Sequence, residues 1–229
     1  MWLSELADSY WFPPVEHALR DPPGLLAAGG DLTPARLLAA YERGIFPWYS
    51  AGQPILWWAP DPRMVLFPQQ FKCSRSLRKK LRQGQFETRV DQAFGAILRA
   101  CAAPRRSGAD TWLNPRMIGA YETLYDRGIG HSVETYQGGE LVGGLYGLQL
   151  GRVFFGESMF SRVADASKVA LARLIDECHA RDIQLIDCQV SSSHLASLGA
   201  REISRAEFVS LLGRYATREP CSRWTDKFP

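Results

Sequence analysis

The chain has 229 residues, of which 46% are apolar and 11% are aromatic, and its formal net charge is +3. This size and composition argue against a disordered protein, because the chain can bury a substantial core in one large domain or two small ones. Nowhere do eighteen apolar residues run together, and the N-terminal stretch lacks the regions of a signal peptide. We therefore expect a soluble cytoplasmic protein with no membrane segment.

The cysteine and histidine spacings argue against a bound metal. Five cysteines are an odd number without a C-x-x-C pair, which favours free thiols in a reducing compartment. They are Cys73, Cys101, Cys178, Cys188 and Cys221. The four histidines have no metal-like spacing with acidic or thiol partners, and no phosphate loop occurs. We expect no metal and no cofactor.

The first sixty residues predict a small α/β unit. Thr33 as N-cap, Pro34 at the first helical position and Gly44 as the stop signal predict a helix. The run from Gly44 to Arg63 is rich in tryptophan and proline, which indicates a rigid loop or hairpin. We place a domain boundary near Pro62, with a small domain at 1–62 and a larger one at 63–229.

A basic stripe without acidic residues follows this boundary, from Arg63 to Phe86. Its members are Arg63, Lys72, Arg75, Arg78, Lys79, Lys80 and Arg82. Such a stripe is typical of a surface for polyanions, because bound phosphates release their counterions. The alternative is a solvated helix face with no partner, and composition alone does not separate the two.

Beyond the stripe the pattern predicts an α+β domain. Apolar periodicity predicts helices at 92–101, 115–125, 165–180 and 205–215. Alternating residues predict strands at 131–136, 140–150, 152–155 and 183–190. The first three strands are expected to be antiparallel, in a mixed and largely antiparallel sheet.

The strand at 183–190 carries a carboxylate beside an amide. Side chains alternate along a strand, so Asp187 and Gln189 share one face. Asp187 can then accept a hydrogen bond from the Gln189 amide nitrogen, which directs the Gln189 carbonyl oxygen outward as an acceptor. Because glutamine is too weak a base to hold a proton, its role would be orientation. The alternative is that both side chains satisfy nearby backbone groups or cap the following loop.

Glu157 is the only charged residue between Arg152 and Arg162, in a stretch of otherwise apolar or small residues. An isolated carboxylate in such surroundings is either paired with a basic side chain of the fold or kept for a cationic substrate.

Four long stretches stand out by their order and spacing. They are GGDLTPARLLAAYERGIFPWYS (29–50), ILWWAPDPR (55–63), FFGESMFSRVADASKVAL (154–171) and LIDCQVSSSHLASLGA (185–200). Together they resemble the leucyl/phenylalanyl-tRNA–protein transferase family over nearly the whole chain except its ends. The resemblance implies a small N-terminal domain and a C-terminal domain like the acetyltransferase (GNAT) superfamily.

The resemblance also implies an activity and its partners. Leucine or phenylalanine, and methionine more weakly, would pass from aminoacyl-tRNA to proteins that begin with Arg or Lys and mark them for degradation by the N-degron pathway. Asp187 and Gln189 would be the catalytic pair. Glu157 would hold the acceptor residue. The alternative is that it contacts the ammonium of the aminoacyl group, which has the same charge. We expect a monomer.

Two further sets of residues match binding positions of the family. The aminoacyl pocket would comprise Leu145, Phe154, Leu171, Leu174, Cys178 and Ile186. Leu174 and Cys178 stand where aromatic rings are expected, and Leu145 where methionine is expected, so the pocket would be roomier or reshaped. The alternative is that these residues are simply core.

The tRNA would be held at its terminal adenosine and along its phosphates. Aromatic rings can stack on a single-stranded base, and the matching positions are Trp48 and Trp112, with Tyr41 and Tyr121 as weaker candidates. The acceptor-stem phosphates would lie on Lys72, Arg75, Arg78, Lys79, Lys80 and Arg82.

Two rival functions remain. An acetyl-CoA-dependent acetyltransferase would need a glycine-bearing loop for the pyrophosphate, and here Asp165 and Ser167 stand in place of the two glycines. A non-catalytic RNA-binding module would explain the basic stripe and the tryptophans, but it leaves Asp187, Gln189 and Glu157 without a role.

Overall fold

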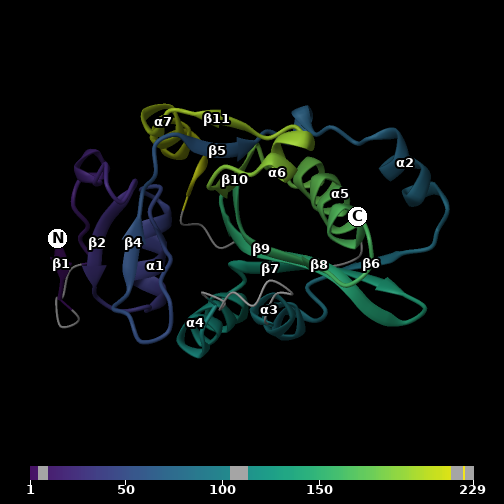
Figure 1. The fold of residues 1–229 in the computed structure, drawn as a ribbon, viewed down its shortest axis with the longest axis horizontal. Coiled ribbons are helices and arrows are strands. Elements are labelled where there is room, and N and C mark those ends of the chain that lie inside the picture. Colours follow the sequence, from purple (N-terminus) through teal and green to yellow (C-terminus); the bar gives the residue numbers. More distant parts are fainter. Residues whose placement is uncertain (5–9, 104–112, 218–223, 225–229) are drawn as a thin grey trace.

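The computed structural model describes residues 1–4, 10–103, 113–217 and 224, and its strands form two sheets (Figure 1). The smaller sheet has the order β1-β2-β4-β3. Its strands are β1 (Trp2–Leu3), β2 (Leu25–Gly29), β4 (Leu56–Trp58) and β3 (Phe46–Pro47). Strands β3 and β4 are antiparallel, which confirms a hairpin in the ring-rich run.

Helix α1 (Pro34–Tyr41) packs beside this sheet and confirms the predicted helix. The Thr33 side chain accepts a hydrogen bond from the backbone nitrogen of Arg36, which satisfies one of the free N–H groups of the first turn. Gly44 follows the helix with φ of 75°, and an added Cβ there would lie 2.9 Å from the Phe208 ring. Glycine is therefore required for both conformation and space.

The larger sheet has the order β11-β5-β10-β9-β8-β7-β6. Its strands are β5 (Arg63–Leu66), β6 (Glu87–Val90), β7 (Gly130–Gln137), β8 (Glu140–Leu150), β9 (Val153–Ser161), β10 (Leu185–Gln189) and β11 (Arg201–Ile203). Only the β9–β10 pair is parallel, which confirms a mixed, largely antiparallel α+β fold.

Strand β9 differs from the prediction because it continues to Ser161 instead of ending at Phe155. The strand pairs with β8 over its whole length, and this tertiary pairing extends it past Gly156. Glu157 consequently lies within a central strand of the sheet.

Helices cover both faces of the larger sheet (Figure 1). Helices α3 (Phe94–Ala102) and α4 (Pro115–Asp126) lie on one face, and α5 (Ala166–Ala180) lies on the other. The remaining helices are α2 (Arg75–Arg82), α6 (Ser193–Ser197), α7 (Arg205–Tyr215) and the short 3-10 turns Val15–His17 and Pro68–Gln70. In the described part of the chain, no helix is long and apolar enough to cross a membrane.

Two clusters of buried side chains form the core. The first extends from Trp57 in the small sheet through Phe155 in the large sheet to Phe208 in α7. The second lies between the large sheet and α5 and contains Phe154 and Leu174. Because the first cluster crosses both sheets, a division into two domains at Pro62 stays a prediction.

Candidate active site

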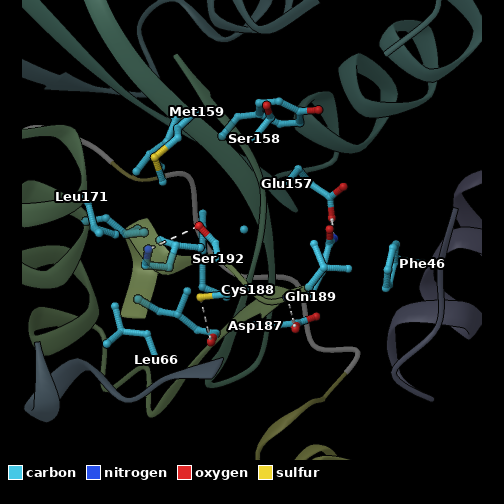
Figure 2. A pocket seen from close by; sticks show the side chains of 18 of the residues that line it. Phe46, Leu66, Glu157, Ser158, Met159, Leu171, Asp187, Cys188, Gln189 and Ser192 are labelled. Carbon is cyan, nitrogen blue, oxygen red and sulfur yellow. Dashed lines mark hydrogen bonds between the residues drawn. The ribbon is translucent and has the colours of Figure 1, made fainter. Parts of the chain in front are cut away.

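A pocket of about 360 Å³ lies beside β9, β10 and α5, and the hairpin of the small sheet closes one side of it. One of its walls is mostly apolar, and the other carries Glu157, Asp187 and Gln189. Figure 2 shows Leu66 and Leu171 at one side and Glu157, Gln189 and Phe46 at the other. Such a cavity suits a ligand that has an apolar group joined to a polar one.

Five of the six residues predicted for an apolar pocket line this cavity. They are Leu145, Phe154, Leu171, Leu174 and Ile186. Cys178 does not line it, which corrects the prediction: the residue lies one helical turn beyond Leu174, buried in the core behind the wall. Burial raises the pKa of its thiol, which therefore stays neutral.

Several apolar residues of this lining, among them Leu66, Met159 and Leu195, were not predicted from the sequence. Met159 is opposite Leu145 in the β8–β9 pairing, and alternation along β9 would have found it had the strand been extended. Leu66 is opposite Ile186 in the β5–β10 pairing. That contact joins segments far apart in the sequence, so no local signal indicates it.

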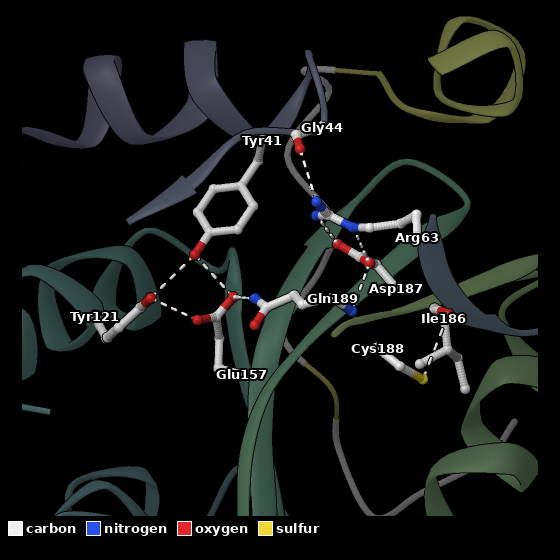
Figure 3. Close-up of polar contacts among 9 residues, drawn as sticks. All are labelled: Tyr41, Gly44, Arg63, Tyr121, Glu157, Ile186, Asp187, Cys188 and Gln189. Atoms are coloured by element: carbon white, nitrogen blue, oxygen red, sulfur yellow. Dashed lines mark hydrogen bonds and ion pairs between the residues drawn. The ribbon is translucent and has the colours of Figure 1, made fainter. Parts of the chain in front are cut away.

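Glu157 is held by three neutral donors (Figure 3). Its Oε1 accepts from the Tyr41 hydroxyl at 2.7 Å and from Gln189 Nε2 at 2.9 Å, and its Oε2 accepts from the Tyr121 hydroxyl at 2.6 Å. The two hydroxyls are also 3.0 Å apart. No ion pair within the described ranges involves Glu157. Of the two alternatives for this carboxylate, pairing with a basic side chain of the fold is therefore excluded.

Tyr41 and Tyr121 therefore do not have the role predicted for them. Both side chains are completely buried, and both hydroxyls are engaged with Glu157. A base of the tRNA cannot stack on a ring that core atoms cover on every side. Burial, and then the Glu157 charge, raise the pKa of both tyrosines, so that they remain protonated donors.

The carboxyl of Glu157 is electrostatically unusual. Burial raises its pKa to about 7, because the charged form loses its hydration. The hydrogen bonds from Tyr121 and Tyr41 oppose this shift, the nearby Asp187 adds to it, and Arg63 opposes it. The group can therefore change its protonation state near neutral pH.

Asp187 and Gln189 occupy a bulge at the end of β10. The pairing with β5 shifts register between the two residues, and Gln189 has φ of 63°. Asp187 Oδ1 accepts from the backbone nitrogen of Gln189 at 2.9 Å. This corrects the predicted contact: the Gln189 side-chain amide donates to Glu157 instead, because the bulge breaks the alternation that would direct it to Asp187.

Asp187 is paired with Arg63, which was predicted to belong to the basic stripe. Arg63 donates through two nitrogens to both carboxylate oxygens, at 2.8 Å and 2.6 Å, and its side chain is 1% exposed. Arg63 is therefore an interior residue and not part of a surface for polyanions. The partners are separated by the length of the domain, so the sequence alone does not reveal the pair.

Of the two predicted tryptophan platforms, Trp48 lines the pocket and is 43% exposed. Its backbone oxygen accepts from Trp58 Nε1 at 2.7 Å, and the two ring centroids are 5.8 Å apart. The ring is thus both anchored and accessible. Trp112 lies outside the described residues.

The basic stripe becomes helix α2 and the residues that precede it. Leu77 packs inward, whereas Arg75, Arg78, Lys79 and Arg82 are exposed. Lys72 is also exposed. Lys80 forms an ion pair with Asp165 at 2.8 Å, so part of its charge is already compensated. Within the described ranges, no group of three or more His, Cys, Asp or Glu residues could hold a metal ion.

The fold and the pocket together define an α+β protein with a pocket whose apolar wall adjoins a buried carboxylate and amide. Residues 65–213 match the family described as Leucyl/phenylalanyl-tRNA protein transferase, and residues 30–61 match its N-terminal domain. The chain belongs to this family and is an aminoacyltransferase that works from tRNA to protein.

Relatives in several bacteria support this membership. A leucyl/phenylalanyl-tRNA–protein transferase of Nitrosomonas eutropha is 58% identical over 203 residues, which is 89% of this chain and 87% of that protein. The same-named protein of Pseudomonas entomophila is 56% identical over 223 residues, 97% of this chain and 98% of that one.

Solved structures with a similar arrangement are more distant. They include L-PGS from Bacillus licheniformis, with a TM-score of 0.42 and 10% identity over 73% of this chain and 53% of that chain. A GCN5-related N-acetyltransferase from Kribbella flavida has a TM-score of 0.39 and 12% identity over 78% of this chain and 63% of that chain. Likenesses at this level say nothing about substrates.

Proposed function

We propose that this chain transfers leucine or phenylalanine, and methionine more weakly, from aminoacyl-tRNA to proteins that begin with Arg or Lys. The observation that supports this is a single pocket whose apolar wall ends at Glu157 and Gln189. Transfer to such proteins would mark them for degradation through the N-degron pathway. The protein would act as a monomer in the cytoplasm.

The donor occupies the pocket with its side chain among Leu145, Phe154 and Leu171. Burying an unbranched apolar side chain there is favourable, and a charged one would lose its hydration without a partner. The terminal adenosine stacks on Trp48, with Trp112 as a second platform, and helix α2 follows the acceptor-stem phosphates. These contacts hold the ester at the polar wall.

The chemistry at that wall is mainly positional. An aminoacyl ester is already activated, and an α-amino group with a pKa of about 7.7 to 8.0 has a usable neutral fraction in the cell. The amine nitrogen attacks the ester carbonyl, the C–N bond forms, and the C–O bond to the ribose breaks. The amine gives up a proton, and the ribose oxygen leaves as a hydroxyl. Holding both reactants in place can supply roughly 7 to 11 kcal/mol.

Gln189 and Glu157 place the acceptor. Because the Gln189 amide nitrogen donates to Glu157, its carbonyl oxygen is left to accept an N–H of the incoming amine. Glu157 lines the same pocket and holds the cationic acceptor residue, whose charge favours the ionised carboxylate. Asp187 supports Gln189 through the backbone.

A transfer assay tests this function. Purified protein is incubated with tRNA charged with radiolabelled leucine or phenylalanine and with a model protein that begins with Arg, beside one that begins with Glu. We expect label on the Arg protein alone, and much less of it with Gln189→Ala. Gln85→Ala, at an exposed position outside the pocket, is the matched control.

The assay has two adverse outcomes. If the tRNA binds and label never moves, the chain is an RNA-binding module and the proposed function is wrong. If label moves equally well with Gln189→Ala, the transfer stands but the role of Gln189 does not.

A further inference from the structure

Arg63 joins four parts of the fold at a point next to the pocket. It is the first residue of β5, and its guanidinium lies between the rings of Phe46 and Phe208, with 4.7 Å and 4.6 Å to their centroids. Its terminal nitrogen NH1 donates to the Gly44 oxygen at 3.0 Å, and its other two nitrogens bind Asp187. All three nitrogens of the group are thus used (Figure 3).

The other end of this contact is the bulge that carries Gln189. The Asp187 oxygen that accepts from Arg63 Nε also accepts from the Gln189 backbone nitrogen. Gln189 adopts a left-handed backbone conformation, which is uncommon for a residue with a side chain and persists only when surrounding contacts impose it. The Arg63–Asp187 pair supplies such a contact from the interior.

The same guanidinium also fixes the opposite wall of the pocket. Gly44 immediately precedes the segment that leads to Phe46 and Trp48, and both of these rings line the pocket. One side chain therefore sets the distance between the bulge and the hairpin. Lysine cannot replace it, because a single ammonium cannot form a planar two-bond contact with a carboxylate while also reaching a third acceptor between two rings.

We infer that Arg63 is a positioning residue for aminoacyl transfer, which acts through Asp187 to hold Gln189 in its bulge and through Gly44 to hold the hairpin wall against it. It touches neither substrate nor phosphate. Asp187, bound to Arg63 by both oxygens and to the Gln189 backbone N–H, is the anchor between them. This inference rests on the proposed role of Gln189 at the reaction centre.

The test compares wild type with Arg63→Lys and with Arg99→Lys, the same change at an arginine of α3 whose side chain is 68% exposed. Transfer from leucyl-tRNA is measured over a range of salt. For Arg63→Lys we expect kcat to fall about 10- to 100-fold, since small misplacements of reacting groups have effects of that size. The salt dependence of the KM for leucyl-tRNA should stay as in wild type, as a residue without phosphate contacts requires, while the KM itself rises to the extent that the wall carrying Trp48 is displaced. Arg99→Lys should match wild type.

A second readout is independent of activity. Hydrogen exchange of the peptide that contains the Gln189 amide is followed in the same proteins under native conditions. We expect faster exchange at this amide in Arg63→Lys, while peptides from α4 keep their wild-type rates. This measurement reports on the bulge even if wild type transfers nothing, in which case the proposed function fails while the positioning role is still tested.

Several results would overturn the inference. A raised KM for leucyl-tRNA with a smaller salt slope would make Arg63 a phosphate contact. Lys79→Ala, at a proposed phosphate contact on α2, is the variant with which that salt slope is compared. An unchanged kcat and an unchanged hydrogen exchange in a folded Arg63→Lys would show that Arg63 does not position Gln189.

If Arg63→Lys does not fold, Phe208→Leu removes one of the two rings that flank Arg63 and keeps both charges of the Arg63–Asp187 pair. It should lower kcat and speed exchange in the same direction, and wild-type behaviour of that variant would count against the inference.

Discussion

At the scale of single residues, the site depends on one carboxyl, Glu157, which no cation of the described residues contacts directly. Glu157 accepts three hydrogen bonds from neutral groups, and burial raises its pKa to about 7 against 4.5 for a free side chain. The hydrogen bonds offset only part of the cost of burying this charge in the free enzyme. A cationic substrate can reduce that cost, which couples binding of the acceptor to ionisation of Glu157.

The raised pKa has a consequence for stability. From about pH 4.5 to 7 the unfolded chain loses the Glu157 proton while the folded chain keeps it, so the contribution of this group to stability falls as the pH rises. Relative to Glu157→Gln, wild type should lose about 3 kcal/mol of unfolding free energy across this range. Urea unfolding of both proteins at several pH values measures it. Parallel pH dependences of the two would mean that the carboxyl is already ionised in the folded protein.

A second residue, Leu174 in the pocket wall, is expected to determine which donor amino acid fits. Leu174 lines the cavity, so Leu174→Phe fills part of the space that a phenylalanyl side chain would need. We expect kcat/KM for phenylalanyl-tRNA to fall about tenfold relative to leucyl-tRNA, a typical effect of a changed apolar contact. The ratio is measured with both donors in competition. Cys178→Ala, one turn behind the wall, should leave the ratio unchanged, and an equal shift there would return Cys178 to the pocket.

At the scale of elements, the basic stripe of the sequence forms helix α2, which exposes most of its basic side chains to solvent. Ser74 caps its first turn by accepting from the Leu77 nitrogen, and Leu77 packs inward. The basic residues Arg75, Lys79 and Arg82 surround a shallow depression on its exposed side. None of the described residues that line this depression is acidic, so its charge is available to a polyanion.

Removing these three charges together tests the helix as a tRNA surface. With Arg75, Lys79 and Arg82 all changed to Ala, affinity for tRNA should fall for every tRNA alike, and the slope of log affinity against log salt should become smaller by about 2 to 3. Fluorescence anisotropy of labelled tRNA over a salt series measures both. Arg127→Ala, exposed at the end of α4, is the control. An unchanged slope would leave α2 as an ordinary solvated face.

At the scale of the whole molecule, the two sheets are joined by more than the chain connection at Pro62. A continuous cluster of buried side chains crosses from Trp57 to Phe155 and Phe208. Two polar links also cross it, from Tyr41 to Glu157 and from Arg63 to the Gly44 oxygen. The pocket lies between these parts, so its walls depend on both.

Such shared contacts predict that the chain unfolds as one unit. Tryptophan fluorescence, which reports heavily on the rings of the small sheet, and far-ultraviolet circular dichroism, which reports on all helices, should give coincident transitions in urea. Tyr41→Phe breaks one of the links and should lower the common midpoint without separating the two curves. Two separated transitions would instead establish residues 1–62 as an independent domain.

Local sequence signals determined most of the elements. The caps at Thr33 and Ser204 and the apolar face of α5 act within a few residues, so the helices lie close to their predicted positions. The run from Glu140 to Leu150 became β8 with the same bounds, because alternation there is a local property. The family resemblance, carried by long collinear stretches, named the activity and five apolar residues of the pocket, and it also named Trp48, Glu157, Asp187 and Gln189, which line the same pocket.

Only the tertiary structure decided what the charged and aromatic residues do. The sequence predicted Arg63 as a surface charge, but the pairing of β5 with β10 places it in the interior. It predicted Tyr41 and Tyr121 as stacking rings, but both hydroxyls donate to Glu157. The contact of the Gln189 side chain changed because a bulge interrupted β10. Composition and periodicity report whether a residue prefers water or the interior, over a range of a few positions. The partner of a buried polar group comes from a distant part of the chain, so only the folded arrangement shows which charge is paired and which is left for a substrate.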